Sequence, residues 1–230
     1  MFRIKIADLT VEIDNKYDYV RALARSYITD GEADFAVSAD EEEIEAEASA
    51  GYSKEYSESI VIYRKIAEVL PKYGALVFHG AVIATDIEAY AFTARSGVGK
   101  TTHINNWLRA FGGDIHILNG DKPILRKIGG KICACGTPWQ GKENMGVNEI
   151  KPLKAIAFLS RSEKNRAAKV GASSVLMPFM TQIYIPNSER EADLALALAA
   201  DILESAELYS LGVNMDIESA MVARAAFDGK

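Results

Sequence analysis

Residues 89–111 read AYAFTARSGVGKTTHINNWLRAF, and the fold assignment depends on this stretch. Residues 89–93 are apolar and predict a β-strand, whereas the spacing of apolar side chains over 100–111 predicts an amphipathic helix. Residues 94–101 lie between them and match the phosphate-binding loop pattern, with alanine in place of the first glycine. A strand, a glycine-bearing turn and a helix in this order predict a loop that cradles phosphate groups.

The side chains of this loop suit a nucleoside triphosphate. Gly97 and Gly99 allow positive φ angles and a close approach of the backbone to a ligand. The Lys100 ammonium would reach the β- and γ-phosphates, and the Thr101 hydroxyl would ligate Mg²⁺, so ATP and Mg²⁺ are the predicted cofactors. The predicted cofactor-binding residues are Arg95, Ser96, Gly97, Val98, Gly99, Lys100, Thr101 and Thr102. A tight β–α turn that uses glycine only for its geometry is the competing interpretation.

A carboxylate follows the next apolar run along the chain. Residues 114–123 read DIHILNGDKP and predict a strand that finishes at Asp121. Ligands of open α/β sheets gather beyond the carboxyl ends of the strands, so Asp121 is expected beside Thr101, where both would hold the metal. The alternative is that Asp121 only begins a turn ahead of Lys122 and Pro123.

Composition excludes several broad classes of protein. The chain has 230 residues, of which 49% are hydrophobic and 25% charged, values typical of a globular chain rather than a disordered, collagen-like or membrane-embedded one. A net charge of −6 disfavours nucleic acid and anionic membranes as partners. The first residues carry charges every few positions and lack the apolar core of a signal peptide, which predicts a cytoplasmic protein.

The first part of the chain predicts a small α+β elaboration over residues 1–72. Alternating apolar residues predict two strands around positions 7 and 8, then a helix over 17–28, a strand over 35–37 and a helix over 57–73. Residues 30–47 carry nine carboxylates and no Lys or Arg. This segment is interpreted as a solvated face near a helix N-terminus, with a metal-binding or partner-binding patch as the alternative.

Residues 73–230 predict the main α/β body. Its expected strands lie at 75–79, 81–85, 89–93, 115–119, 123–127, 131–135, 155–159 and 183–185. Its expected helices lie at 100–111, within 175–181, at 189–205 and at 217–225. Alternation of strands and helices with no low-complexity linker favours one body over two independent domains.

The run FHGAVIATDIEAYAFTARSGVGKTTH, residues 78–103, resembles the catalytic core of the HPr serine kinase/phosphorylase group. That group is itself similar to the ATP-dependent phosphoenolpyruvate carboxykinases. The resemblance is carried by His79 and Gly80, which open one strand, and by residues 96–101, which match Ser-Gly-x-Gly-Lys-Ser/Thr. It covers residues 75–160 and extends less closely to residues 207–221.

The resemblance implies a mixed β-sheet P-loop kinase core and an ATP-dependent kinase. The γ-phosphate would pass to a hydroxyl of an HPr-like carrier protein or of a small metabolite, with Asp121, His79 and Lys100 as catalytic residues. The family has two adjacent acids where this chain has Asn119-Gly120-Asp121, so only Asp121 carries over. A carboxykinase-type enzyme and a non-catalytic nucleotide-binding regulator are the alternatives, and a homo-oligomer is left open.

Residues 135–148, CGTPWQGKENMGVN, predict an irregular, exposed loop that acts as a lid or recognises the substrate. Trp139, Gly141, Lys142 and Glu143 are its candidate residues. Lys142 would clamp a phosphate or an acidic substrate, and Glu143 would supply the second acid. An ordinary surface loop is the alternative.

Overall fold

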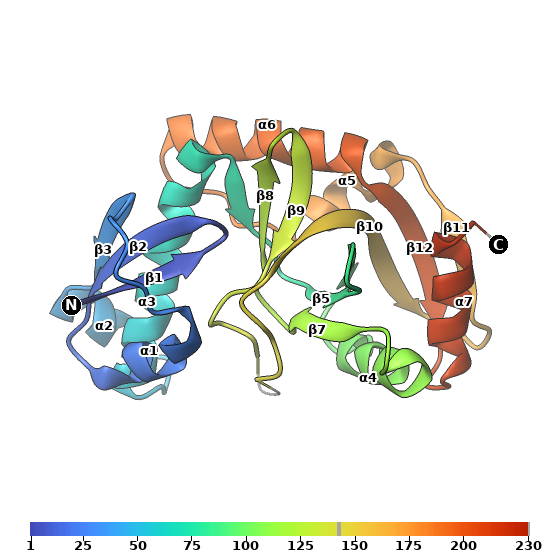
Figure 1. The fold of residues 1–230 in the computed structure, drawn as a ribbon, viewed down its shortest axis with the longest axis horizontal. Coiled ribbons are helices and arrows are strands. Elements are labelled where there is room, and N and C mark those ends of the chain that lie inside the picture. Colours follow the sequence, from blue (N-terminus) through green and yellow to red (C-terminus); the bar gives the residue numbers. More distant parts are fainter. Residues whose placement is uncertain (142–143, 230) are drawn as a thin grey trace.

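The protein is seen in a computed structural model that describes residues 1–141 and 144–229. It is a mixed α/β molecule with a small sheet at the N-terminal end and a larger mixed sheet in the rest of the chain (Figure 1). The residues predicted for nucleotide binding lie in the part of the chain that forms the larger sheet, and the N-terminal part packs against that sheet.

The small sheet has the order β1-β2-β3. β1 (Phe2–Ile6) and β2 (Leu9–Asp14) form the expected antiparallel hairpin, and β3 (Phe35–Ser38) pairs parallel with β2. Ala7 and Asp8 make the turn with φ angles of 48° and 58°. Alternate residues of β1 are buried, as the period of a strand with one covered face requires, and in β2 Thr10 is buried as well as the apolar residues.

Three helices accompany this sheet, namely α1 (Asp18–Leu23), α2 (Glu41–Ala48) and α3 (Lys54–Val69). The helix expected over 17–28 is shorter than predicted, because α1 stops at Leu23 and a 3₁₀ turn follows over Arg25–Tyr27. α2 lies in the acidic segment and begins with a capping box between Asp40 and Glu43. α3 continues into a 3₁₀ turn over Leu70–Tyr73.

The acidic face of α2 contacts α3 through ion pairs. Lys65 Nζ lies 2.7 Å from Glu43 Oε1, and Arg64 Nη2 lies 2.6 Å from Glu47 Oε2. Lys54 pairs with two further glutamates of α2. Among the described residues, no group of three or more His, Cys, Asp or Glu side chains is placed to hold a metal ion. The acidic segment is therefore a helix face neutralised in part by its neighbour.

The larger sheet has the order β4-β8-β9-β10-β6-β5-β7, and β12 pairs with β10 and β11. Its strands are β4 (Ala75–Val77), β5 (Ala81–Ala84), β6 (Ala89–Thr93), β7 (His116–Asn119), β8 (Ile124–Ile128), β9 (Lys131–Cys135), β10 (Ile150–Arg161), β11 (Arg166–Lys169) and β12 (Glu207–Val213). β10 pairs parallel with β6 and β12, and its first residues pair antiparallel with β9.

Helices cover both faces of this sheet. They are α4 (Lys100–Phe111), α5 (Ala172–Met180), α6 (Glu189–Ser205) and α7 (Glu218–Phe227). Tyr90 and Phe92 of β6 pack with α4 and α7, whereas Ala91 between them packs with the cluster that includes α5 and α6. Figure 1 shows α6 along one side of the sheet and α4 and α7 on the other. Burial on both faces explains why these strands read as continuous apolar runs.

Predicted and observed elements differ at a few places in the larger sheet. Residues 183–185 are not a strand, and only an isolated bridge between Phe78 and Ile183 forms there. β10 begins five residues earlier than the expected 155, since Ile150 already pairs with Cys135 of β9. β11 was not expected, because its sequence RAAK is short, partly charged and without apolar alternation.

One hydrophobic cluster includes residues of both sheets. The cluster formed by the N-terminal strands and α3 includes Ile124, Cys133, Cys135 and Trp139 of the main body. Both cysteines are free thiols and are buried. Arg126 of β8 also donates a hydrogen bond to the carbonyl of Ala7. The first 72 residues are thus packed directly on the main body.

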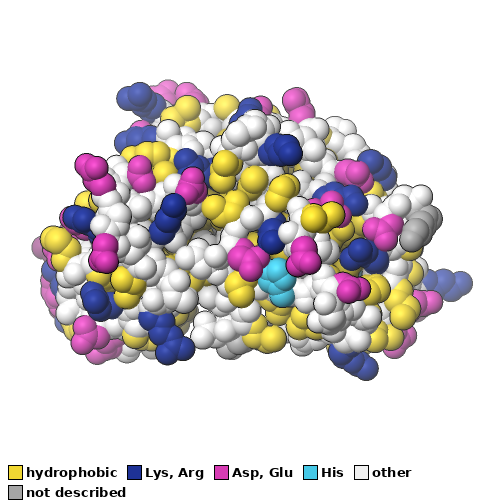
Figure 2. Space-filling model, viewed as in Figure 1, with side chains coloured by type: hydrophobic (Ala, Val, Ile, Leu, Met, Phe, Trp, Pro, Cys, Tyr) yellow, Lys and Arg dark blue, Asp and Glu magenta, His cyan; other side chains and the backbone are white. Residues whose placement is uncertain are grey.

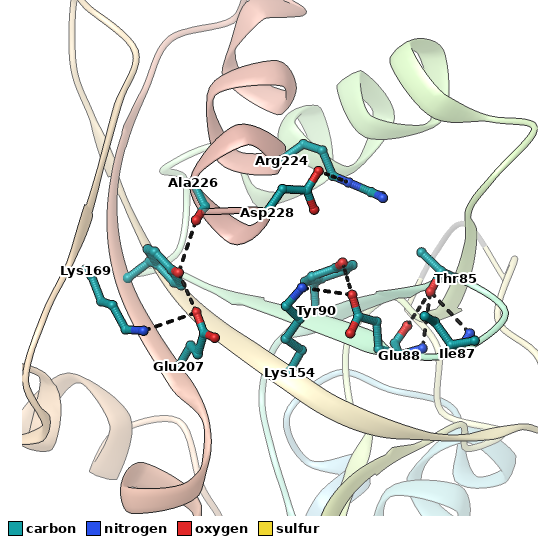
Figure 3. Close-up of polar contacts among 11 residues, drawn as sticks. Thr85, Ile87, Glu88, Tyr90, Lys154, Lys169, Glu207, Arg224, Ala226 and Asp228 are labelled. Atoms are coloured by element: carbon teal, nitrogen blue, oxygen red, sulfur yellow. Dashed lines mark hydrogen bonds and ion pairs between the residues drawn. The ribbon is translucent and has the colours of Figure 1, made fainter. Parts of the chain in front are cut away.

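Two similar clusters of polar side chains link neighbouring strands of the sheet where β6 and β12 begin (Figure 3). Tyr90 donates to Glu88, which also lies 3.1 Å from Lys154 Nζ. On the neighbouring strands, Glu207 accepts from the Tyr209 hydroxyl at 2.6 Å and lies 3.4 Å from Lys169 Nζ. These contacts connect the first residues of the parallel strands to their neighbours.

The surface carries charges of both signs. In Figure 2, basic and acidic side chains are interspersed over the face shown, with no broad area of one sign. Among the helices of the described residues, none combines the length and the apolar character needed to cross a bilayer.

Candidate functional site

Strand order brings three segments together at one end of the strands of the larger sheet. They are the residues before β5, the residues after β6 and the residues after β7. β5 lies between β6 and β7 and is antiparallel to both, so β6 and β7 point the same way. Ala81 at the start of β5 is paired with Phe92, and Val82 with Asn119. The residues just before β5 therefore meet the carboxyl ends of β6 and β7, which is where ligands of open α/β sheets gather.

His79 and Gly80 are held by backbone hydrogen bonds from two sides. His79 N donates to Gln182 O at 2.6 Å, and Gly80 N donates to Asp121 O at 2.9 Å. Thr93 at the end of β6 donates its hydroxyl to His79 O and to Gln182 Oε1, both at 3.1 Å. Thr93 and Gln182 were not predicted as site residues, and nothing in their local sequence marks them.

Gly80 is required by close packing. A Cβ atom at this position would lie 2.3 Å from the Phe78 ring and 2.9 Å from the Phe92 carbonyl oxygen. The second contact is with backbone and cannot be relieved by a side-chain rotation. A larger residue at position 80 would therefore displace the backbone, and His79 with it, from its observed position.

The loop after β6 has the backbone geometry expected of an anion-binding turn. Gly97 and Gly99 have φ angles of 78° and 116°, which only glycine adopts without strain. Val98 N donates to Arg95 O at 3.2 Å and closes the turn. Gly99 is the N-cap of α4 and supplies no side-chain cap, so the helix presents its N-terminal amide end to the loop.

Lys100, Asp121 and His79 form one polar cluster beside this loop. Lys100 Nζ and His79 Nε2 lie 3.9 and 3.3 Å from the same oxygen, Asp121 Oδ1. Burial opposes ionisation of Asp121, but the hydrogen bond from His79 and the charge of Lys100 outweigh it and lower the pKa of Asp121. Asp121 is therefore ionised at neutral pH, the state needed to bind a cation or accept a proton. The structure brings the three predicted catalytic residues together.

Asn119 organises the turn that carries Asp121. Its side chain is fully buried, and the side-chain oxygen Oδ1 accepts hydrogen bonds from the backbone N–H groups of Asp121 and Lys122 at 2.9 and 2.8 Å. Its amide nitrogen donates to Thr137 Oγ1 at 3.0 Å. In the sequence, Asn119 stands out as a departure from an acid pair, and an Asn-Gly-Asp sequence is a signal for this type of turn.

The predicted substrate loop is largely buried in its first half, contrary to the expectation of an exposed segment. The Trp139 ring stacks on Tyr63 of α3 with centroids 4.2 Å apart, and its Nε1 donates to Ser59 O at 3.1 Å. Gly141 is exposed and has a φ of 80°. Lys142 and Glu143 lie outside the described residues. A large apolar ring beside a long amphipathic helix packs against it because burial removes apolar area from water.

The remaining predicted binding residues lie along the loop and the first turn of α4. Arg95, Ser96 and Thr101 are exposed. Arg161 at the end of β10 donates to Gly97 O, so a residue of a neighbouring strand supports the loop. The register explains this contact, because Phe158 of β10 pairs with Thr93 and the strand runs three residues beyond it.

Two cavities border the candidate site, one at the phosphate-binding loop and one at His79. One, of about 670 Å³, is lined by the loop, Thr102 and the ends of β10 and β12. The other, of about 270 Å³, is lined by His79, Lys122 and residues of α3 and the 181–184 segment. A further cavity of about 770 Å³ lies between β3, α2 and α3, and none of the residues predicted for catalysis or cofactor binding lines it.

The side chains present fit a magnesium ion that arrives with a nucleotide. Mg²⁺ is commonly held by one or two carboxylates together with phosphate oxygens and water. Asp121 offers an ionised carboxylate and Thr101 an exposed hydroxyl at the start of α4. This small set of oxygen donors suits a metal that is bound jointly with phosphates and does not form a cage of protein ligands.

Comparisons with known proteins find a distant likeness in fold. No protein-family profile matches the chain, and no curated protein matches it in sequence. Among solved structures, the HPr(Ser) kinase/phosphatase from Coxiella burnetii matches with a TM-score of 0.38 and 8% sequence identity. The match covers 66% of this chain and 93% of that chain. A likeness this distant leaves the family undefined, so function has to follow from the chemistry of the site.

Proposed function

We propose that this chain binds Mg²⁺-ATP at residues 94–102 and transfers the γ-phosphoryl group to a hydroxyl acceptor. The proposal rests on one observation above the others. Asp121 Oδ1 lies within 3.9 Å of Lys100 Nζ and 3.3 Å of His79 Nε2, at the mouth of a loop with two left-handed glycines and an uncapped helix N-terminus.

The loop would bind the triphosphate through its backbone. Amide groups of the loop and of the first turn of α4 would donate to phosphate oxygens, and the Lys100 ammonium would neutralise charge on the β- and γ-phosphates. Thr101 and Asp121 would hold Mg²⁺, which would supply further neutralisation of phosphate charge. Because phosphoryl transfer requires little covalent chemistry from the protein, positioning and charge neutralisation supply most of the rate.

Asp121 would accept the proton of the acceptor hydroxyl. Its lowered pKa keeps it ionised, and a phosphate that draws Lys100 away would raise its basicity at the moment it is needed. His79 donates to the same carboxylate and would hold its orientation toward the acceptor. His79 is therefore proposed to position Asp121 and the transferred group.

The nucleoside part of ATP would occupy the 670 Å³ cavity beside the loop. Gly97, Val98 and Thr102 line this cavity on one side, and Val213 and Asn214 line it on the other. A cavity of this size lies within the range typical of small-ligand sites. Its position next to the loop allows one molecule to contact both.

Turnover of ATP tests the proposal. We expect Asp121→Asn to reduce the rate of ADP release from Mg²⁺-ATP at least about hundredfold, because the amide cannot accept the proton. Asp86→Asn is the matched control, since Asp86 is exposed on the turn at the other end of the β5–β6 hairpin, and its rate should equal that of the unaltered protein. An Asp121→Asn protein that releases ADP at the unaltered rate would disprove the mechanism.

A nucleotide-binding regulator without turnover is the second candidate. It is favoured by Asn119, a neutral and fully bonded residue at the position of an acid in the family that the sequence resembles. Binding of Mg²⁺-ATP with no ADP release under any acceptor condition would select this function over the kinase.

A further inference from the structure

The cavity next to His79 lies between the N-terminal helix α3 and the main body. Its volume is about 270 Å³, below the usual range of small-ligand pockets, so it suits a compact molecule. Ile60, Ala67, Val77 and Ile183 give it an apolar wall. His79 also lines this cavity, and its Nε2 lies 3.3 Å from Asp121 Oδ1, so a molecule in the cavity would contact the residue that holds the proposed catalytic carboxylate.

The polar groups of the lining are already bonded, with one exception. The Tyr63 hydroxyl donates to Lys122 O at 2.7 Å, and the Tyr184 hydroxyl donates to Glu68 at 2.6 Å. Arg64 is paired with Glu47. The Lys122 ammonium has no hydrogen bond or ion pair with any residue that the structure describes, and its charge acts on Asp121 only at a distance. Among the residues with a described placement that line the cavity, none is Asp or Glu. The described part of the lining therefore offers no anion to Lys122.

We propose that this cavity binds the phosphate acceptor and that the acceptor is a small hydroxy acid. The carboxylate of the acceptor would pair with Lys122, its hydroxyl would face His79 and Asp121, and its carbon skeleton would contact the apolar wall. The cavity volume of about 270 Å³ allows only a compact skeleton, in which the carboxylate and the hydroxyl are separated by a few bonds. This inference rests on the proposed kinase function and specifies its substrate class.

The transfer balances in atoms and charge. The hydroxyl oxygen of the hydroxy acid forms a bond to the γ-phosphorus, and the bond from that phosphorus to the β–γ bridging oxygen breaks. ADP leaves with the electron pair of the broken bond. The hydroxyl proton passes to the Asp121 carboxylate and then to solvent, which leaves a phosphorylated hydroxy acid as product.

Matched pairs of acceptors test the charge requirement. Lactate, glycerate and 3-hydroxybutyrate would each be compared with the alcohol that lacks the carboxylate, namely 1,2-propanediol, glycerol and 1,3-butanediol. Product is followed as a new phosphate monoester by ³¹P NMR with Mg²⁺-ATP, and a seryl peptide is included as a third arm. We expect phosphorylation of at least one hydroxy acid, at least about tenfold faster than of its alcohol, as a charge-assisted hydrogen bond predicts.

Two variants locate the binding site. Ala67→Leu fills the cavity from α3 and should raise the KM for the hydroxy acid without changing ATP affinity. Ala50→Leu is the matched control, because Ala50 is exposed in the turn before α3 and lines none of this wall. Lys122→Gln should lower the rate ratio of hydroxy acid to alcohol about tenfold, a readout that is independent of any general loss of activity.

The outcomes separate this proposal from the proposed function. Equal transfer to alcohols and hydroxy acids, transfer to the seryl peptide alone, or an unchanged KM in Ala67→Leu would overturn the hydroxy-acid site. Absence of transfer to every hydroxy acid, in a protein that binds and hydrolyses ATP, would overturn it as well and leave the kinase proposal standing. Absence of ATP binding would overturn the kinase proposal first.

Discussion

At the scale of single residues, Asn119 and Asp121 divide two tasks that an acid pair would share. Asn119 is fully buried and uses both ends of its amide, so its role in this chain is to fix the turn. Asp121 keeps the ionised carboxylate and faces Lys100 and His79. The described turn at residues 119–122 therefore carries one acid, Asp121, and Asn119 has a structural role.

Asn119→Asp should destabilise the protein and not restore a second catalytic acid. The new carboxylate would replace an amide that donates to Thr137 and Trp139 and would face their oxygen atoms in a buried place. We expect a loss of about 3 kcal/mol in the free energy of unfolding, measured by urea denaturation. Asn105→Asp, on the exposed side of α4, should change it little. A stable Asn119→Asp protein with faster ADP release would contradict this account.

His103 should make stability depend on pH. Burial lowers the pKa of His103 to about 4, and the ring accepts a hydrogen bond from Trp107 Nε1 at 3.0 Å. Below pH 6.5 the unfolded chain binds a proton at this residue that the folded protein does not bind until about pH 4. The free energy of unfolding should therefore fall by up to about 3 kcal/mol as the pH drops through this window.

The measurement for His103 is urea denaturation at a series of pH values. His103→Gln keeps a hydrogen-bond acceptor for Trp107 and should lose this part of the pH dependence. His116→Gln, a partly exposed residue that pairs with Glu149, should keep it. Identical pH profiles for the unaltered protein and His103→Gln would refute the assignment.

At the scale of elements, the β6–loop–α4 unit was the most predictable part of the molecule. Residues 89–93 and 100–111 form β6 and α4 with the expected bounds, because periodicity and glycine positions act locally. The site needs more than this unit. Gln182 reaches His79 from a distant segment, and β10 brings Arg161 to Gly97, contacts that depend on strand order and register.

Gly99→Ala should weaken nucleotide binding through the backbone alone. Gly99 has a φ of 116°, and a Cβ there would meet no atom within 4 Å, so the cost is conformational and not steric. We expect about 1–2 kcal/mol of lost stability and a lower affinity for Mg²⁺-ATP. Gly113→Ala is the matched control, with open space around the position and no positive φ. Equal ATP affinity in both variants would argue against the loop geometry.

At the scale of the whole molecule, the N-terminal residues and the main body form a continuous structure. The chain passes from the small sheet to the larger sheet between β3 and β4, and the hydrophobic cluster of the N-terminal part includes Trp139, Cys133 and Cys135 of the main body. The sequence did not predict this contact, because local patterns identify which residues are buried and not which element covers them. The same contact makes α3 a wall of the cavity next to His79.

We expect the protein to unfold as one cooperative unit. Its two tryptophans report on different cores, since Trp139 packs on α3 and Trp107 packs between β6 and α7. In Trp107→Phe and in Trp139→Phe, the fluorescence of the remaining tryptophan should follow the same urea transition as far-UV circular dichroism of that variant. A separate fluorescence transition in either variant would indicate that the two parts unfold independently.

The most direct test of the central claim is isothermal calorimetry of Mg²⁺-ATP binding. The unaltered protein should bind one nucleotide per chain, and Lys100→Ala should lose that binding because the phosphates lose their main cation. Lys131→Ala, at the exposed start of β9, should bind as the unaltered protein does. Flat heats for the unaltered protein at millimolar Mg²⁺-ATP, or equal binding by Lys100→Ala, would contradict the account.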